Sequence, residues 1–480
     1  MKLHPHILLV SILMAITYDR GLAKSAIHNG YQVTLAVPNA YSQGFTGRAF
    51  LMETSQVQPS FRVALTVEAF KDRYSCSLEV FLGDVRVWNS GHYSRFYTSD
   101  RCLVELTDDG DLLLKGAGDQ VGWRTGTSGQ GVERLVILGN GNLVLVDRTN
   151  LIKWQSFNFP TDVMLQGQRL NVATRLTSFP NNSTLFYTLE IQHTRVALYL
   201  CSSSGNKRNN YSYWEFRPDP KGNNISFLEV AASGLQFFND KYDKFTQIPS
   251  EKGIQLWPLR FLSLGNRTGN LGLYFSNPDK GIFQAAFQAL TSTCDLPLAC
   301  RPYGICTLSN SCSCIRLITK GSPSTSSENC NAGFPADFCG LEADMLELDG
   351  VTSVLRGATS TPNATKQGCA SSCLEDCKCM ASLFVYLSSS EDPNLGECYM
   401  YEMVVGVKQV DSGKRLTYMV KVPKGSELGG LKKSGGVKRW VLTLVGVVDG
   451  LIIVLVLGGL GYYFIRKRRK NLTPLVHEAT

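Results

Sequence analysis

The sequence predicts a mainly β protein that continues into disulfide-rich modules and ends near a single transmembrane helix. Three observations lead to this fold class. Short apolar runs that end in tryptophan recur before residue 160, and twelve of the fifteen cysteines cluster between Cys294 and Cys398. The third is the stretch from Trp440 to Ile465, which is apolar apart from one charged residue. Strand-like segments, a cysteine cluster and a span therefore follow one another along the chain.

Residues 30–160 form the first predicted module, because three similar segments repeat within them. The segments run from residue 78 to Trp88, from 112 to Trp123 and from 143 to Trp154. Each contains a short apolar strand, a polar turn and a second short strand, and the segments recur every 31 to 35 residues. Such recurrence indicates a repeat architecture. Three hairpins that bury their tryptophans on a shared axis predict an all-β prism or barrel, with the tryptophans in its core.

Residues 165–290 are predicted to form a second β module. Apolar and polar residues alternate over 185–191 and 196–200, which is typical of strands with one buried face. Further strands are expected at 213–216, 226–230, 259–264 and 271–275. No run of helical period and useful length interrupts them, so we expect a scaffold of strands here too.

The two ends of the chain predict a type I membrane protein. Lys2 precedes a short apolar run, and the small residues Gly21 and Ala23 follow it, which is typical of a cleaved secretory signal over 1–23. An uncleaved anchor is the alternative. Residues 440–465 are long enough to cross a bilayer as a helix.

The segments beside this span complete the predicted topology. Residues 423–439 are rich in Gly, Lys and Ser and are expected to form a juxtamembrane linker. Residues 466–480 would be a short basic cytoplasmic tail, too short for a kinase. We therefore expect a plasma-membrane protein whose N-terminal part is extracellular.

The formal net charge of +8 is concentrated beside the predicted span. Residues 466–480 carry +4 and residues 421–439 carry +5, which leaves −1 for the rest of the chain. A near-neutral exterior offers no basic surface for nucleic acid, and the tail is expected to meet anionic lipid headgroups. Asn-x-Ser/Thr sequons predict N-glycosylation of the exterior at Asn181, Asn182, Asn210, Asn224, Asn266 and Asn363.

The clustered cysteines predict small disulfide-stapled modules over 294–330 and 339–422. Spacing alone leaves many connectivities open. A zinc site is disfavoured, because an oxidising lumen removes the thiolates that zinc needs. Cys76 and Cys102 flank a predicted strand pair and are candidates for one bridge. Cys201 is then left over, either buried or available for an intermolecular disulfide, and we expect it to be buried.

Three motifs of the first module resemble the bulb-type (mannose-binding) lectin domain of plant S-domain receptor-like proteins. They are DDGDL at 108–112, GNGNLVL at 139–145 and WQSFNFPTD at 154–162, of which the last is the most specific. Downstream, RPYGIC at 301–306 is similar to the EGF-like module of that family. The run from Gly368 to Cys379 and the strand at 416–422 are similar to its PAN/apple module.

The resemblance covers residues 30–422 in the order of the family. It implies tandem bulb-lectin-like β-prism modules over 30–160 and 165–290, an EGF-like module over 294–330 and a PAN/apple module over 339–422. The chain would thus be a PAN domain-containing, S-domain receptor-like protein without the kinase that the family usually carries. The resemblance also implies six stem disulfides: Cys294–Cys306, Cys300–Cys312, Cys314–Cys330, Cys339–Cys377, Cys369–Cys398 and Cys373–Cys379.

The sugar-binding motif of this family is degenerate here. Members with an intact site carry Q-x-D-x-N-x-V-x-Y, whose amide and carboxylate groups hold adjacent mannose hydroxyls. The third repeat keeps the second amide but has Leu138 and Val146 in the Gln and Tyr places, and the second repeat matches only at its first aspartate. Since apolar side chains cannot supply the missing hydrogen bonds, we expect no mannose binding through this motif. Its candidate residues are Asp109, Asp111, Asn140 and Asn142.

The sequence disfavours an enzyme, because it contains no nucleophile, metal-ligand or nucleotide-binding motif, and no cofactor is expected. It favours a non-catalytic cell-surface recognition or co-receptor glycoprotein that binds a protein, peptide or glycan and acts through a membrane partner. That partner would be a receptor-like kinase, or a second copy that associates through the PAN module and the span. The alternative is a lectin-like glycoprotein that binds cell wall or matrix without a signalling role.

Three residues of the span are candidates for helix association. Gly446 and Gly450 form a small-residue face, and Asp449 places a carboxylate near mid-bilayer, where a charge is expensive and often marks a partner. The alternative is a tolerated aspartate with glycines present by composition.

Overall fold

The computed structural model describes residues 25–38, 44–54, 59–70, 73–180, 184–202, 210–218, 224–249, 258–277, 279–315, 317–318, 330–331, 334–335, 337–356, 360–387, 394–411, 415–428 and 439–470. The expected signal at 1–23, the sequons Asn181 and Asn182 and the tail beyond 470 lie outside these residues. Contacts divide the chain into a large part, residues up to 314 with 328–424, and a small part, residues 315–327 with 425–480.

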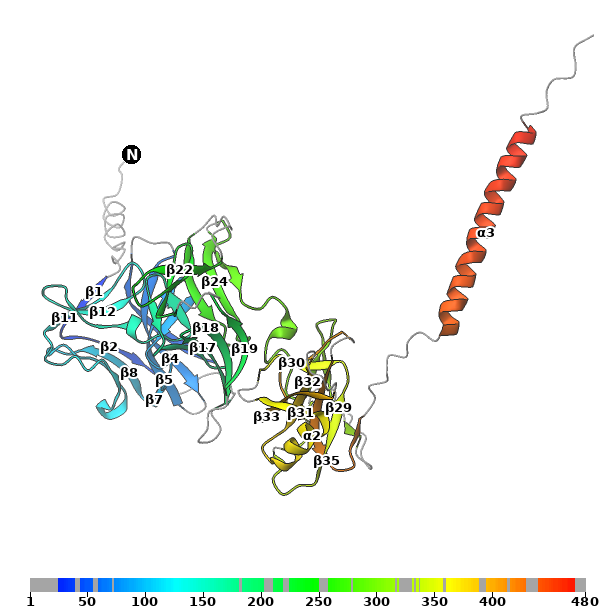
Figure 1. Ribbon diagram of the computed structural model, residues 1–480. Coiled ribbons are helices and arrows are strands. Elements are labelled where there is room, and N and C mark those ends of the chain that lie inside the picture. Colours follow the sequence, from blue (N-terminus) through cyan, green and yellow to red (C-terminus); the bar gives the residue numbers. More distant parts are fainter. Residues whose placement is uncertain are drawn as a thin grey trace, which may run out of the picture. The chain divides into compact units, whose positions relative to one another are not determined.

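The N-terminal region of the large part contains three antiparallel sheets, which we call the first three-sheet unit (Figure 1). One sheet contains β1 (Ala26–His28), β11 (Val132–Ile137), β12 (Leu143–Asp147) and β13 (Ile152–Gln155). The next contains β2 (Tyr31–Ala36), β8 (Arg101–Leu106), β9 (Leu112–Lys115) and β10 (Val121–Arg124). The third contains β3 (Thr46–Glu53), β4 (Phe61–Phe70), β5 (Arg73–Leu82), β6 (Val85–Asn89) and β7 (Phe96–Thr98).

The three predicted tryptophan hairpins are present, one in each sheet. They are β5–β6, β9–β10 and β12–β13, and in each the tryptophan lies on the second strand. Trp88, Trp123 and Trp154 meet edge to face with ring centroids 5.9 to 6.1 Å apart. Edge-to-face pairing suits aromatic quadrupoles and adds to the burial energy. The shared axis predicted from the repeat is therefore confirmed.

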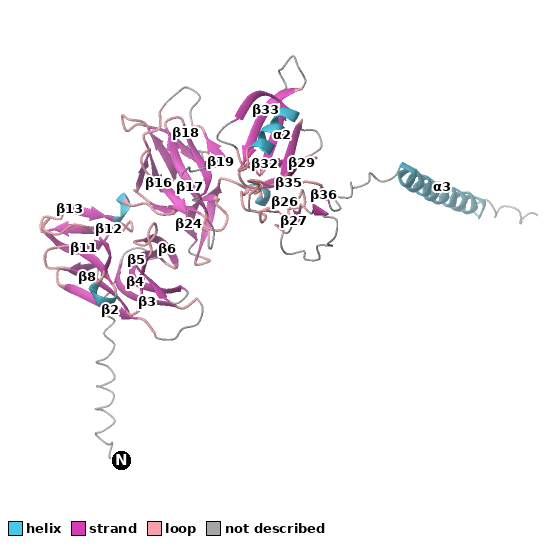
Figure 2. Ribbon diagram, turned by 90° about the horizontal axis from the view of Figure 1, so that it is seen from below, coloured by secondary structure: helices cyan, strands magenta, loops and turns pink. Residues whose placement is uncertain are grey.

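The second three-sheet unit follows, again with antiparallel sheets (Figure 2). Its first sheet contains β14 (Val163–Leu165), β23 (Leu259–Leu264), β24 (Leu271–Asn277) and β25 (Ile282–Gln288). The second contains β15 (Arg169–Asn171), β20 (Phe227–Ala231), β21 (Gly234–Phe238) and β22 (Lys244–Ile248). The third contains β16 (Arg175–Ser178), β17 (Leu185–Gln192), β18 (Arg195–Ser202) and β19 (Asn210–Phe216).

All six strands expected in this region are present, but sequence analysis missed the other six. Strand β25 shows why, because its residues are half-buried or exposed along the strand and carry no alternation to detect. The apolar core of the first unit also extends to Val163, Leu165 and Phe261 of the second. The core of the first unit therefore continues into the sheet of β14 and β23, which is the first sheet of the second unit.

The described residues of 294–314 and 330–422, the cysteine-rich stem, form two sheets and a helix. One sheet contains β27 (Cys312–Cys314), β26 (Gly304–Cys306), β34 (Val407–Gln409) and β30 (Val351–Ser353). The other contains β29 (Ala343–Leu348), β35 (Leu416–Pro423), β32 (Ala381–Tyr386), β33 (Leu395–Tyr401) and β31 (Ser360–Thr365). Because β26 pairs in parallel with β34, the expected EGF-like and PAN/apple segments share a sheet.

Helix α2 (Lys366–Glu375) packs against the five-stranded sheet of the stem (Figure 1). Its N-terminus is capped by Thr365, whose hydroxyl accepts a hydrogen bond from the Gly368 backbone N–H at 3.0 Å. At its C-terminus, Lys421 Nζ donates to the backbone oxygens of Cys373, Leu374 and Asp376 at 3.0 to 3.1 Å. Lys421 is 2% exposed. A buried cation thus supplies the donors that a helix end lacks.

Seven disulfides cross-link the large part, and they join the same cysteines that sequence analysis pairs. They are Cys76–Cys102, Cys294–Cys306, Cys300–Cys312, Cys314–Cys330, Cys339–Cys377, Cys369–Cys398 and Cys373–Cys379. Cys201 is buried on β18, with its Sγ 3.6 Å from the Thr188 hydroxyl. Its burial agrees with the expectation, and an intermolecular disulfide from this position would require the strand to open.

The small part contains the strand pair β28 (Leu317–Ile318) and β36 (Glu427–Leu428) and the helix α3 (Arg439–Lys470). Helix α3 includes the expected span 440–465. A search of the described residues finds no helix both long enough and apolar enough to cross a membrane. The side chains at 439–449, 452, 469 and 470 lie outside the described residues, and these include Gly446 and Asp449. The predicted transmembrane helix is therefore not confirmed.

Candidate ligand-binding cleft

A repeated hydrogen bond closes each tryptophan hairpin of the first unit. The residue two positions after each tryptophan is Ser90, Thr125 or Ser156, and its hydroxyl accepts a backbone N–H at 3.0 to 3.1 Å. The donors are equivalent as well, since they are the first apolar residues of the three segments: Leu78, Leu112 and Leu143. We call these three contacts the hydroxyl latches. Sequence analysis missed them, although the spacing from tryptophan was a usable signal.

Asp111, a candidate sugar residue, is used internally by the second repeat. Its Oδ1 accepts hydrogen bonds from the Thr125 hydroxyl and from the backbone N–H groups of Gly126 and Thr127 at 2.8 to 3.1 Å. Its Oδ2 lies 2.7 Å from Arg124 Nη2. The residue is 2% exposed. This carboxylate fixes the segment after β10, as buried carboxylates with several donors commonly do.

Asn142, at the equivalent position of the third repeat, also forms internal hydrogen bonds that hold the segment after its hairpin. Its Nδ2 donates to Gln155 Oε1 at 2.8 Å, and its Oδ1 accepts from the Ser156 hydroxyl at 3.2 Å and the Phe157 N–H at 3.3 Å. It is 4% exposed. Both buried members of the degenerate motif therefore hold the polypeptide that follows their hairpin.

The other two candidates, Asp109 and Asn140, are exposed in the turns before β9 and β12. The hydroxyls of Ser128 and Thr107 donate to Asp109 and lower the pKa of its carboxyl. The Asn140 Oδ1 accepts a hydrogen bond from the Asn142 N–H at 3.2 Å. The four candidates thus lie in two turns of two different sheets, and the structure does not gather them into one site.

A polar cleft of about 80 Å³ lies instead over the sheet of the first repeat. Strands β4, β5 and β6 supply its floor, the loop after β6 supplies one wall, and three residues of the second unit complete it. The lining residues are Glu68, Ser75, Cys76, Ser77, Arg86, Asn89, Gly91, His92, Arg95, Asp162, Phe179 and Asn266. These residues are dispersed from Glu68 to Asn266 along the sequence, which explains why no local motif revealed the cleft.

Glu79 lies beneath this cleft, bonded to three of its lining residues. Its Oε1 accepts hydrogen bonds from Ser77, Arg86 and Asn89 at 2.8 to 3.3 Å. The residue is 2% exposed, and its Oε2 has no hydrogen-bond partner among the described residues. An unsatisfied buried carboxylate oxygen is costly.

His92 forms the aromatic wall of the cleft. Its Nε2 donates to the Thr177 backbone oxygen at 2.7 Å, so the proton sits on Nε2. Burial lowers the pKa of His92, while the nearby Asp162 carboxylate opposes the shift. Its ring lies 4.8 Å from the ring of Tyr93 and 5.4 Å from that of Phe179. Both neighbours remain exposed, so the cleft opens beside an aromatic rim.

Among the described residues, no group of three or more His, Cys, Asp or Glu side chains is arranged to hold a metal ion. The lining carries charges of both signs, Arg86 and Arg95 with Glu68 and Asp162, and Arg86 is also paired with Glu79 beneath it. Donors and acceptors of this mixed kind suit a polar ligand without a large charge.

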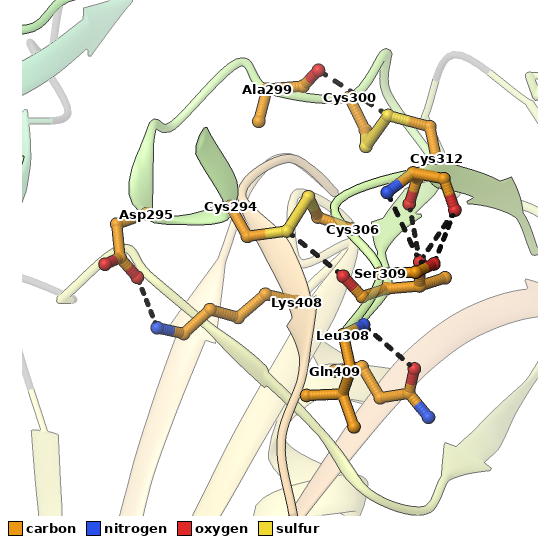
Figure 3. The surroundings of a disulfide bond; sticks show 12 residues. Cys294, Asp295, Ala299, Cys300, Cys306, Leu308, Ser309, Cys312, Lys408 and Gln409 are labelled. Atoms are coloured by element: carbon orange, nitrogen blue, oxygen red, sulfur yellow. Dashed lines mark hydrogen bonds and ion pairs between the residues drawn. A yellow bond between two sulfur atoms is a disulfide. The ribbon is translucent and has the colours of Figure 1, made fainter. Parts of the chain in front are cut away.

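The stem shows a different kind of organisation, in which disulfides and polar contacts join loops to strands (Figure 3). Asp295 forms an ion pair with Lys408 of β34, and the Leu308 N–H donates to Gln409 Oε1 at 3.4 Å. The loop that carries Asp295 and the loop that carries Leu308 both lie beside the Cys294–Cys306 bond.

Comparison with known proteins finds a similarity to lectins in the first three-sheet unit. Residues 87–181, which contain all three tryptophans, match the D-mannose binding lectin family. A mannose-binding lectin structure from Gastrodia elata is 18% identical and covers 28% of this chain and 96% of its own, with a TM-score of 0.19, which is too low to bear on the fold.

Two curated relatives from Arabidopsis thaliana extend the similarity beyond the lectin region. A PAN domain-containing protein is 25% identical over 376 residues, covering 74% of this chain and 68% of its own. The G-type lectin S-receptor-like serine/threonine-protein kinase SD2-5 is 24% identical over 421 residues, covering 82% of this chain and 47% of its own. The chain thus spans about half the length of that kinase. These findings confirm the resemblance to plant S-domain receptor-like proteins.

Proposed function

We propose that the protein is a non-catalytic cell-surface recognition glycoprotein, a co-receptor that acts through a membrane partner. Residues 30–160 and 165–290 would be the lectin-like modules, residues 294–330 the EGF-like module and residues 339–422 the PAN/apple module. Its exterior would bind a protein, peptide or glycan. The relatives named above are a PAN domain-containing protein and a receptor-like kinase, which supports this reading.

The observation that carries the proposal is the set of seven disulfides, which extends from Cys76 to Cys398. Disulfides form and persist in oxidising compartments and are rare in the cytosol. Their distribution supports an extracellular location for both three-sheet units and the stem. A C-terminal epitope should then be inaccessible on intact cells, and the native protein should carry no reactive thiols in the stem.

Membrane attachment would come from residues 440–465. The described side chains of α3 support this, because large apolar residues such as Leu455, Leu457 and Tyr462 are about half or more exposed along the helix. An apolar helix surface of this extent is stable only against lipid or another apolar partner. The positively charged residues 466–470 that follow would stop transfer and face the cytosol.

A partner within the membrane would be recognised through Asp449, with Gly446 and Gly450 allowing close approach of a second helix. Affinity capture from plant membranes tests this with the full-length protein and two variants. The Asp449→Leu variant is expected to lose the receptor-like kinases that the wild type captures. The Thr443→Leu variant removes a polar group of the same segment without a charge and should keep them.

Unchanged capture by Asp449→Leu would contradict partner recognition through the span. The alternative function, a wall-binding or matrix-binding lectin, predicts the opposite pattern of results. It requires binding to a glycan array and no co-purified receptor. The burial of Asp111 and Asn142 and their internal hydrogen bonds argue against such binding through the degenerate motif, because both side chains hold the segment that follows their own hairpin.

A further inference from the structure

One predicted glycosylation site lies at the edge of the polar cleft. Asn266 begins the sequon Asn266-Arg267-Thr268 in the turn between β23 and β24, and all three residues are exposed. The turn is ordered by the Gly265 N–H, which donates to the Asn270 backbone oxygen at 2.9 Å. Asn266 itself lines the cleft. An oligosaccharide attached at this amide therefore starts at the cleft entrance.

The cleft has the chemistry that such an oligosaccharide requires. Inner sugars of N-linked glycans are uncharged and carry hydroxyl and amide donors and acceptors. The cleft offers two serine hydroxyls, the amide of Asn89 and charged groups of both signs. Beneath it, Glu79 Oε2 lacks a donor. This oxygen is buried, so a sugar in the cleft would meet Ser77 and Asn89 instead, which line the cleft and donate to the other oxygen of the same carboxylate.

We propose that the cleft holds the inner sugars of an N-linked glycan carried by Asn266 of the same chain. This inference depends on the proposed function, because N-glycosylation requires passage through the secretory pathway. The glycan joins the β23–β24 turn of the second unit to β5 and β6 of the first. It also covers the cleft, so that a free sugar does not enter.

The size of the cleft favours an attached ligand over a free one. About 80 Å³ is well below the volume of typical ligand sites, so few contacts are available to offset the entropy of association. A covalent link to Asn266 removes most of that cost, since a short tether gives an effective concentration in the millimolar range. Weak contacts are then sufficient for occupancy.

Two other sequons provide internal controls. Asn224 and Asn363 are exposed, and neither lines the cleft. Glycans at these two positions should be free in solution. The full-length protein, produced in plant cells, is treated under native conditions with an endoglycosidase that cuts between the two inner sugars. Glycopeptide mass spectrometry then follows release at each site. We expect release from Asn266 to be at least tenfold slower than from Asn224 and Asn363.

Variants of the cleft test the cause of this protection. Arg95→Ala and Asn89→Ala each remove a lining side chain and are expected to raise the release rate at Asn266 at least threefold. Arg148→Ala, which removes a highly exposed arginine in the β12–β13 turn, should leave the rate unchanged. Thermal unfolding of each variant is measured in parallel. If either Arg95→Ala or Asn89→Ala fails to fold, the remaining cleft variant decides the test.

The outcomes separate this inference from the proposed function. Equal release rates at all three sites, an unmodified Asn266 beside modified Asn224 and Asn363, or protection that both cleft variants leave intact would each overturn the glycan assignment alone. Absence of glycan from every sequon would instead overturn the extracellular location and the proposed function with it.

Discussion

The three-sheet units and the cysteine-rich stem are stabilised in different ways. The first unit has one continuous apolar core, in which Leu65, Leu78 and Leu145 are fully buried, and a single disulfide. The stem has six disulfides, and its clusters of buried apolar residues are small. Strand repeats can bury a large apolar area by closing on one axis, whereas short loops need covalent links. The first unit is therefore stabilised mainly by burial of apolar residues, and the stem mainly by disulfide cross-links.

A matched pair of disulfide deletions tests that difference most strongly. The Cys76–Cys102 bond of the first unit and the Cys369–Cys398 bond of the stem close loops of similar length, 26 and 29 residues. Chain entropy assigns each about 3.5 kcal/mol. We expect the double serine variant at 369 and 398 to lose the folded stem, because Cys369 and Cys398 are also half of the buried residues of its core cluster.

The double serine variant at 76 and 102 should stay folded with a lower melting temperature, because the apolar core of the first unit remains. Limited proteolysis with mapping of the cut sites distinguishes the two results. Equal tolerance of both deletions would show that burial also dominates in the stem.

The buried lysine of the stem gives the next largest effect. Burial lowers the pKa of Lys421, with Asp376 opposing the shift, yet its three hydrogen bonds satisfy the end of α2. Lys421→Met leaves three carbonyl oxygens without a donor in an apolar setting, and we expect a loss of about 2 kcal/mol in unfolding free energy. Denaturant titration of the purified wild type and variant measures this difference in unfolding free energy.

Lys424→Met is the control for this prediction. Lys424 is the same residue type, lies just after β35 and forms an exposed ion pair with Glu342 at 3.2 Å. Exposed pairs contribute about 0 to 1 kcal/mol. A larger loss from the Lys424 variant than from the Lys421 variant would contradict the role given to the buried cation.

The same contrast explains which features the sequence reveals. The tryptophan hairpins are local, so that Trp88, Trp123 and Trp154 and their turns could be recognised from spacing alone. The stem pairs followed from similarity to a family, because cysteine spacing permits many connectivities. Strand β25 lies at the edge of its sheet beside β24 and has no alternation of buried and exposed residues. The shared sheet of β26 with β34 joins segments that are distant in sequence. Neither could be recognised from a residue pattern.

The candidate site shows more clearly what could not be predicted from the sequence. The motif residues Asp111 and Asn142 could be found by pattern, but their roles depend on the donors around them, which only the folded chain brings together. The cleft combines residues from β4 to the β23–β24 turn. Sequence analysis singled out three of its members, Cys76 as a disulfide candidate, Asp162 as the end of a family motif and Asn266 as a sequon, but nothing in the sequence placed them together. Individual motif residues could therefore be predicted from the sequence, but the assembly of distant residues into one cleft could not.

The hydroxyl latches provide a smaller and more local test of the three-sheet units. Ser90→Ala, Thr125→Val and Ser156→Ala each leave a backbone N–H at the start of a hairpin without its acceptor. We expect each to cost about 1 to 2 kcal/mol in denaturant titrations, because an unsatisfied buried donor carries its full desolvation penalty. Equal losses of unfolding free energy at all three sites would show that the contact stabilises each of the three repeats to the same extent. Ser128→Ala, at an exposed serine outside the latches, is the control.

The smallest expected effect is a pH dependence centred on His92. Because burial lowers the pKa of His92 in the folded protein, the unfolded chain binds the proton first as the pH falls. Stability should therefore decrease below about pH 6.5, the ordinary pKa of histidine, and be unaffected above it. The positive groups Arg86 and Arg95 act in the same direction, and Asp162 opposes them.

The His92→Gln variant keeps a donor for the Thr177 carbonyl and removes the titration. Its melting temperature between pH 7 and pH 5 should fall less than that of the wild type, whereas His193→Gln, a change at an exposed histidine, serves as the control. A wild-type slope in the His92→Gln variant would mean that other groups set the pH response. The loss of the His92 ring should also weaken the wall of the cleft, so release of the Asn266 glycan would rise with the same substitution.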